Sequence, residues 1–174
     1  MIAAFDNTFL TLVLNPNSNI PIDPSTGVAL THCYQRIDAL IDAHSVRQDS
    51  IIIPSPCLSE MLCSVPDLEV AVGEIRRSTA MEIYPFDSRC AIDLAEVVRQ
   101  AIASGDKKSG VDAGWQEIKF DRQIAVIAKT NGAQVFYTDD KNQTEFSKQL
   151  GMSVKHTWEL DIPPSHAQVN MEGI

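Results

Sequence analysis

The sequence alternates short runs of apolar residues with longer segments in which apolar residues recur at helical spacing. The runs that we interpret as strands are Ile2–Phe5, Ser50–Ile53, Met81–Tyr84 and Val135–Tyr137, with a short fifth strand around Val154. Short strands that are apolar on both faces and separated by helices are typical of a parallel sheet covered on both sides. We therefore expect an α/β fold, in which right-handed crossovers connect about five parallel strands between two layers of helices.

Polar residues mark where we expect the helices to begin and end. Three helices are predicted to start after Thr31, after Asp87, and after Asn142, which forms a capping box with Glu145. Pro66 is expected to end the helix after the second strand, and Asn131-Gly132 the helix before the fourth. The polar segments Asn15–Gly27 and Ser104–Gly114 are predicted to be loops.

Length and composition indicate one globular domain. The 174 residues are 44% hydrophobic, which is enough for a substantial core, and we place the domain at residues 1–160, followed by a tail at 161–174. No apolar run approaches the roughly 20 residues that span a bilayer, and the N-terminus lacks a basic segment. Four cysteines without CxxC spacing are expected to be reduced thiols. These features predict a cytoplasmic protein that makes no membrane contact.

The formal net charge is −9, which argues against a surface that binds nucleic acid through general basicity. It does not exclude an enzyme that acts on nucleic acids. A cluster of carboxylates that holds a divalent cation would itself contribute to the negative charge, and the cation would offset part of it locally.

Acidic residues follow several of the predicted strands. Asp6 comes directly after the first strand, and Glu60 lies in the first turns of the helix after the second. Asp121 is expected to open the helix that leads to the fourth strand, which Asp139 and Asp140 follow directly. In a parallel α/β sheet the carboxyl ends of the strands and the N-termini of the helices share one edge, where ligands bind. We therefore expect these acids to converge there.

Carboxylates that crowd together repel one another unless a cation neutralises them or some of them stay protonated. Oxygen ligands with no nearby His or Cys favour Mg²⁺ or Mn²⁺, and such a site can activate a water for in-line attack on a phosphate. Any single acid here could instead be a helix cap or a partner of the helix dipole, and Asp139-Asp140 by itself is an ordinary turn signal. It is their joint placement that favours a metal site.

Four segments resemble PIN-domain nucleases, the family that includes the VapC-type toxins of toxin–antitoxin pairs. They are Ala4–Leu10, Pro56–Leu62, Lys119–Ala128 and Tyr137–Asp140, and the resemblance extends over roughly residues 1–155. It implies a three-layer α/β/α fold with strand order 3-2-1-4-5. It also implies cleavage of RNA, supported by Mg²⁺ or Mn²⁺, to leave a 5′-phosphate.

By motif, Asp6, Glu60 and Asp121 match the family's three core acids. The fourth acid stands two positions after a hydroxyl residue, which matches Asp140 after Thr138, with Asp139 as the alternative. The resemblance implies that Asp6, Asp121 and Asp140 bind metal and that Glu60 binds metal or orients the attacking water. Two further residues are expected to support the site, namely Thr138 through its hydroxyl group and Asn7 as a small polar residue.

Basic residues near the Asp121 segment are candidates for binding RNA, although each is also consistent with an ordinary solvated charge. They are Arg122, Lys119, Lys107 and Lys108, of which Arg122 is the foremost because it directly follows a predicted ligand. Trp115 is expected to pack rather than to stack on a base. The resemblance further implies an antitoxin protein that covers the acidic edge, and it is compatible with a homodimer.

Two other functions remain open from the sequence. One is a catalytically inactive PIN-like fold that binds a partner protein. The other is a receiver-like phosphoacceptor domain, which would use Asp87 after the third strand. A haloacid-dehalogenase-type phosphatase is rejected, because it needs a DxD motif after the first strand and this chain has Asp6-Asn7-Thr8.

Overall fold

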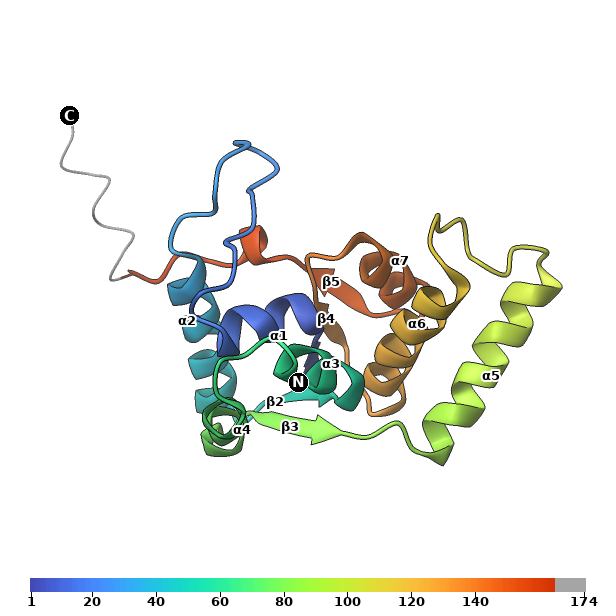
Figure 1. Ribbon diagram of the computed structural model, residues 1–174, viewed down its shortest axis with the longest axis horizontal. Helices are drawn as coiled ribbons and strands as arrows, with labels where there is room; N and C mark the ends of the chain where they lie inside the picture. Colours follow the sequence, from blue (N-terminus) through green and yellow to red (C-terminus); the bar gives the residue numbers. More distant parts are fainter. Residues whose placement is uncertain (165–174) are drawn as a thin grey trace.

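Five parallel strands form one sheet in the order β3-β2-β1-β4-β5 in the computed structural model, which describes residues 1–164 (Figure 1). The strands are β1 (Ile2–Phe5), β2 (Ser50–Pro54), β3 (Met81–Tyr84), β4 (Val135–Tyr137) and β5 (Ser153–Lys155). The predicted strand segments and the predicted strand order are both confirmed. Residues 165–174 of the predicted tail lie outside the described residues.

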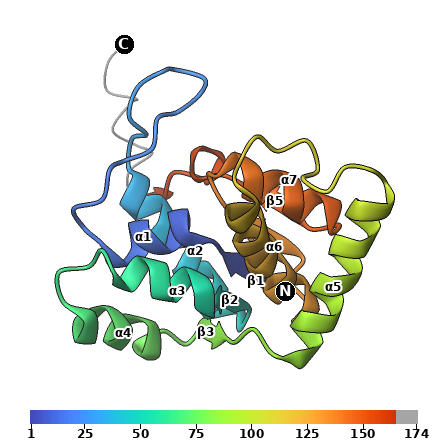
Figure 2. The same cartoon turned by 45° about the vertical axis from the view of Figure 1, so that its right-hand side comes forward.

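Helices flank the sheet in a three-layer α/β/α arrangement. Within residues 1–164 they are α1 (Asn7–Leu14), α2 (Cys33–Arg47), α3 (Ser55–Leu62), α4 (Leu68–Arg77), α5 (Ser88–Ala103), α6 (Trp115–Thr130), α7 (Lys141–Gln149) and the 3₁₀ turn η1 (Thr157–Glu159). Both views place α5 at the outer edge of the molecule, beside α6 (Figures 1 and 2). The architecture is PIN-like, as predicted.

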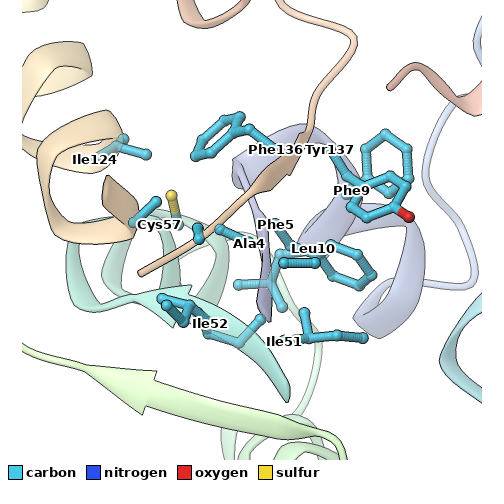
Figure 3. Packing of buried hydrophobic residues seen from close by; sticks show 14 of the residues in the cluster. Ala4, Phe5, Phe9, Leu10, Ile51, Ile52, Cys57, Ile124, Phe136 and Tyr137 are labelled. Carbon is cyan, nitrogen blue, oxygen red and sulfur yellow. The ribbon is translucent and has the colours of Figure 1, made fainter. Parts of the chain in front are cut away.

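The core is built on the two central strands. The side chains of Ala3, Ala4 and Phe5 in β1 and of residues 51–53 in β2 are fully buried, as expected for parallel strands covered on both faces. Phe5 pairs in register with Tyr137, and their ring centroids lie 5.5 Å apart and each 5.4 Å from the ring centroid of Phe9 (Figure 3). Burying each large apolar side chain contributes about 1.5–3 kcal/mol. This packing holds the carboxyl ends of β1 and β4 side by side.

Several helix ends differ from the sequence predictions. Helix α1 was not predicted, and it starts at once after β1 because Asp6 caps it by accepting a hydrogen bond from the Phe9 amide. The cap of α2 is His32 rather than Thr31, and its side chain makes no capping hydrogen bond. Helix α7 is capped by Asp140 rather than Asn142, because Asp140 accepts from the Gln143 amide.

The predicted position of Asp121 was also wrong, because α6 begins at Trp115 and Asp121 therefore lies in its second turn. Pro66 does not end α3, which stops at Leu62. The two predicted loops are confirmed as segments without helices or named strands, and Asp87 caps α5 as predicted. Gly132, with φ of +87°, follows the end of α6 in the left-handed region, where glycine carries no steric penalty.

All four cysteines are free thiols; Cys33, Cys57 and Cys90 are buried, whereas Cys63 is exposed. In the part of the chain that the structure describes, no helix is both long enough and apolar enough to cross a bilayer.

Candidate active site

An acidic pocket of about 310 Å³ lies at the carboxyl edge of the sheet. It is lined by Asp6, Asn7, Thr8, Glu60, Glu117, Phe120, Asp121, Ile124, Asp140 and Gln143. The structure thus brings together the four acids that matched the PIN motifs, although they come from β1–α1, α3, α6 and the β4–α7 turn. None of these lining residues is basic, so the charge of the pocket is uniformly negative when its carboxyl groups are ionised.

Asp6 forms the floor of the acidic pocket and is only 1% exposed. Its Oδ1 accepts hydrogen bonds from the Thr8 hydroxyl at 2.7 Å and from the Phe9 amide at 3.0 Å. Its Oδ2 accepts a short hydrogen bond from the Thr138 hydroxyl. These three donors hold the carboxyl group in one orientation, because the end of β1, the first turn of α1 and the end of β4 are fixed by the core.

A continuous set of hydrogen bonds joins Asp140 and Asp121 to Asp6. The Thr138 hydroxyl, which donates to Asp6, accepts from the Asp140 amide at 2.9 Å. Asp140 in turn accepts from the Gln143 amide at 2.8 Å. The side-chain amide of Gln143 donates to the backbone oxygen of Asp121 at 3.2 Å and to its Oδ1 at 3.3 Å. The predicted supporting role of Thr138 agrees with this placement.

Burial and mutual repulsion make two of these carboxyl groups hard to ionise. Desolvation raises the pKa of Asp6 from 3.8 to about 7, despite the three hydrogen bonds that lower it. Desolvation, together with the nearby charges of Asp140, Glu117 and Glu60, raises the pKa of Asp121 from 3.8 to about 6. A pocket with these properties gains stability from any cation that enters it, because the cation offsets both effects.

Asp139, the alternative fourth acid, is directed elsewhere. Its carboxylate accepts from the Thr157 amide at 2.8 Å and from the Thr157 hydroxyl at 2.7 Å. Its own amide donates to the Thr8 hydroxyl at 3.0 Å. Asp139 therefore ties η1 to the end of β4, and it does not line the acidic pocket. Of the two neighbours, the structure places Asp140 with the other acids.

The side-chain atoms of the pocket that could coordinate a metal ion are all oxygens, which suits Mg²⁺ or Mn²⁺. Two further oxygens, Asn7 Oδ1 and Gln143 Oε1, are buried there without a hydrogen-bond partner among the described residues, and a hard cation would use such atoms. Within residues 1–164, however, no three Asp, Glu, His or Cys side chains already stand in a metal-binding arrangement. The residues fit such a metal by chemistry and charge, and binding it would require the carboxylates to draw together.

The predicted RNA-binding residues surround the first half of α6. Lys107 and Lys108 are exposed in the segment between α5 and α6, and the ammonium group of Lys107 lies 3.9 Å from the Trp115 ring centroid. Lys119 is half-buried, with its ammonium group 6.0 Å from the same ring. Arg122 is only 2% exposed, which is inconsistent with a surface contact to RNA. Trp115 packs, as predicted.

Four pocket residues were not singled out from the sequence. Thr8 bonds to Asp6, Gln143 bonds to Asp121, Glu117 adds a fifth carboxylate, and Phe120 is 37% exposed at the pocket. Glu117 lies one helical turn before Asp121, and this spacing could have indicated that both acids face the pocket. The spacing was not recognised as helical because α6 was expected to start at Asp121, whereas it begins at Trp115.

Asp87, which the receiver-like alternative needs as its phosphoacceptor, lies away from the acidic pocket. Its carboxylate caps α5 by accepting from the Cys90 amide at 3.0 Å, and it pairs with Arg89 at 3.0 Å. The strand order also places β3 at the edge of the sheet. The geometry therefore does not favour a receiver-like site.

No protein-family model matches the sequence, and no curated protein sequence matches it either. Solved structures with the same fold include a chain from VapBC2 of Rickettsia felis, in complex with a promoter DNA fragment. It is 15% identical, with a TM-score of 0.57. A chain of DNA-bound VapBC from Salmonella typhimurium is 16% identical, with a TM-score of 0.54. A chain of VapBC-1 from nontypeable Haemophilus influenzae is 14% identical, with a TM-score of 0.50.

Each of these three similarities covers 90% of the present chain and 98% of the other chain. At such identities the similarity shows a common fold over nearly the whole of both chains.

Proposed function

We propose that this protein is a Mg²⁺- or Mn²⁺-dependent endoribonuclease and that it is the toxin of a toxin–antitoxin pair. One observation carries the proposal: four acids from four separate segments, each at a position where PIN-domain nucleases have one, line a single pocket. A structural role for these acids would not require them to meet. The shared fold with VapBC chains supports the same function.

Asp6, Asp121 and Asp140 would hold the metal, and Glu60 would either join them or orient the attacking water. When bound, the ion would polarise the scissile phosphate and lower the pKa of a water that attacks it. Asp6 is preorganised for this task by three hydrogen bonds, so little reorganisation is needed at the floor of the pocket. Thr138 couples Asp6 to Asp140, and Gln143 couples Asp140 to Asp121.

Glu60 differs from the other three acids because its side chain is exposed. An exposed carboxylate at the rim can accept a proton from water and return it to solvent without the cost of desolvation. We therefore assign the water-orienting role to Glu60 and the metal-holding role to the more enclosed acids.

Single-stranded RNA would reach the pocket along the first half of α6. Phe120, partly exposed at the pocket, offers an aromatic face on which a base can stack, and such contacts contribute about 1–3 kcal/mol each. Lys107, Lys108 and Lys119 would bind phosphates beside it. Because the pocket itself has no basic lining, these lysines and the metal must supply the positive charge that holds RNA.

The solved VapBC structures are complexes, and two of them are bound to DNA. By analogy, an antitoxin would bind the present chain and cover the acidic pocket. A basic side chain of the antitoxin inserted among the carboxylates would relieve the same repulsion that a metal ion relieves. We also propose a homodimer, which size-exclusion chromatography with light scattering would detect.

The test is cleavage of a 5′-labelled single-stranded RNA by the purified protein in Mg²⁺, in Mn²⁺ and in EDTA. We expect metal-dependent cleavage that falls at least about a hundredfold in Asp6→Asn and in Asp121→Asn, because each removes a metal ligand. Products should carry a 5′-phosphate, which a phosphate-dependent 5′-exonuclease would detect.

Glu145→Gln is the matched control, since Glu145 is an exposed acid on α7 outside the acidic pocket. Its rate should stay within about twofold of the wild type. Undiminished cleavage by Asp6→Asn would mean that the activity belongs to another site or to a contaminant. A wild type that neither cleaves RNA nor binds Mn²⁺ would point to an inert fold that binds partners.

A further inference from the structure

A second cavity, of about 450 Å³, lies between α5, α6 and α7, beneath the segment that joins α5 to α6. Its apolar lining residues include Val97, Ala101, Val126, Phe146 and Leu150, and its polar ones include Gln100, Ser104, Ser109 and Gln149. It shares no lining residue with the acidic pocket. Its volume is within the range of small-molecule sites, which are roughly 300–1,000 Å³. We call it the α5–α7 cavity.

Arg122 is the one basic residue among the described residues that line this cavity, and it is 2% exposed. Its Nη2 donates to the Ser109 hydroxyl at 2.8 Å, but its Nε and Nη1 are buried and have no hydrogen-bond partner in the described chain. The guanidinium carbon lies 5.2 Å from the ring centroid of Phe146 and 5.8 Å from that of Trp115.

A guanidinium group carries five N–H donors, and leaving buried donors unpaired costs free energy. The ring faces of Phe146 and Trp115 favour the cation but accept no conventional hydrogen bond. Asp106 also lines the cavity, yet it forms no ion pair with Arg122 among the described residues. Within residues 1–164, the only acceptor hydrogen-bonded to the guanidinium group is the neutral Ser109 hydroxyl. The cavity therefore contains a buried positive charge that has no direct ion pair among the described residues, although the charge of Asp106 acts on it from a longer distance.

We propose that the α5–α7 cavity binds a small organic carboxylate whose apolar part lies against Val97, Ala101 and Leu150. The carboxylate would accept hydrogen bonds from the unpaired Nε and Nη1 of Arg122, beside the Ser109 hydroxyl that accepts from Nη2. A single cation with Asp106 nearby balances a singly charged group better than a doubly charged phosphate. This site is independent of the proposed nuclease function.

Binding is tested by NMR on the full chain with benzoate, phenylacetate and hexanoate as probes, each paired with its neutral amide. Inorganic phosphate is added as a separate probe. We expect at least one carboxylate to shift the Trp115 indole resonance and the amide resonances of Ala101 and Ala125 in a saturable way. Its amide should bind at least about tenfold more weakly, because it lacks the charge that Arg122 pairs with.

Two variants locate the site. Arg122→Met keeps the length of the side chain without its charge and should abolish the preference for carboxylate over amide. Ala101→Phe fills the cavity while leaving Arg122 in place, and it should abolish binding of both. Because Ala101 is only half-buried on α5, this second variant keeps the test decisive if Arg122→Met does not fold.

Three results would overturn the proposal: no carboxylate shifts these resonances at tens of millimolar, the amides bind as tightly as the acids, or Ala101→Phe binds like the wild type. Binding of phosphate alone would also overturn it, because it would indicate a different ligand chemistry. None of these readouts involves RNA cleavage, so failure here is distinct from failure of the nuclease proposal.

Discussion

Replacing Asp6 by Asn should change how the stability of the protein depends on pH. Asp6 is 1% exposed, and desolvation raises its pKa from the ordinary value of 3.8 to about 7. Asparagine has nearly the same shape, and its oxygen can still accept from the Phe9 amide. The variant therefore removes the ionisation at the floor of the acidic pocket while preserving the cap of α1.

The raised pKa of Asp6 determines whether its ionisation stabilises or destabilises the fold as the pH rises. Since the pKa in the folded state lies above the value of 3.8, the neutral carboxyl group stabilises the fold at low pH. That stability is lost as the pH rises from about 4 through about 7. At 1.36 kcal/mol per pK unit, the cost of ionising Asp6 in the fold grows by roughly 2.5 kcal/mol between about pH 5 and about pH 8.

The assay is urea unfolding of wild type and Asp6→Asn in EDTA across that pH range. The free energy of unfolding of the variant minus that of the wild type should rise by roughly 2.5 kcal/mol from about pH 5 to about pH 8. Millimolar Mn²⁺ should restore much of the lost stability to the wild type at the upper pH and do little for the variant, because the ion binds the ionised carboxylate.

A difference that stays constant within about 0.5 kcal/mol over the whole range would refute the reasoning that burial keeps Asp6 neutral. Taking the difference between the two proteins cancels the titration of Asp121, whose pKa is also raised and whose side chain is present in both.

Asp140→Asn should abolish metal-dependent cleavage with less than about 1 kcal/mol lost in urea unfolding, because Asn also caps helices well. Asp139→Asn should do the reverse: cleavage within a few-fold of wild type and about 1 kcal/mol lost, since the bonds to Thr157 are weakened. Thr138→Val leaves the Asp140 amide without its acceptor and Asp6 without one donor, so it should lower the free energy of unfolding by about 1–3 kcal/mol. Because the Thr138 hydrogen bond lowers the pKa of Asp6, the loss of stability with rising pH should also extend to higher pH in this variant. Phe136→Ala removes a fully buried ring from β4 and should cost about 3–5 kcal/mol in urea unfolding.

The strands and their order could be predicted because each strand is an apolar run bounded by turn residues, and because the PIN-like motifs imply one topology. The convergence of Asp6, Glu60, Asp121 and Asp140 followed from the geometry of parallel sheets, in which strand ends share an edge. That argument needs the position of each acid relative to its strand or helix. It does not need exact helix boundaries, so it succeeded although the start of α6 was misplaced by six residues.

Choosing between Asp139 and Asp140 required the structure. Adjacent residues after a strand point in different directions, and which one reaches the pocket depends on Thr157, a residue distant in sequence that binds Asp139. The burial of Arg122 was hidden for a similar reason. A charged residue beside a predicted ligand suggests a surface role, whereas here Trp115 and Phe146 enclose it.

The missed helix α1 has a local cause. Asp6 was interpreted as a metal ligand, and its second role as the cap of α1 went unnoticed, so the apolar residues that follow were not assigned to a helix. The cap does not conflict with the proposed metal role, since one oxygen of Asp6 accepts from the amide of Phe9 while the other is directed toward Thr138.

The most direct test of whether Asp6, Glu60, Asp121 and Asp140 form one cation site is a Mn²⁺ titration. The electron paramagnetic resonance signal of the free ion measures how much Mn²⁺ is bound. Wild type should bind Mn²⁺, and Asp6→Asn, Asp121→Asn and Asp140→Asn should each weaken binding at least about tenfold. The Glu145→Gln control should bind like the wild type. Equal binding by the wild type and all three variants, or no binding by the wild type, would contradict the account.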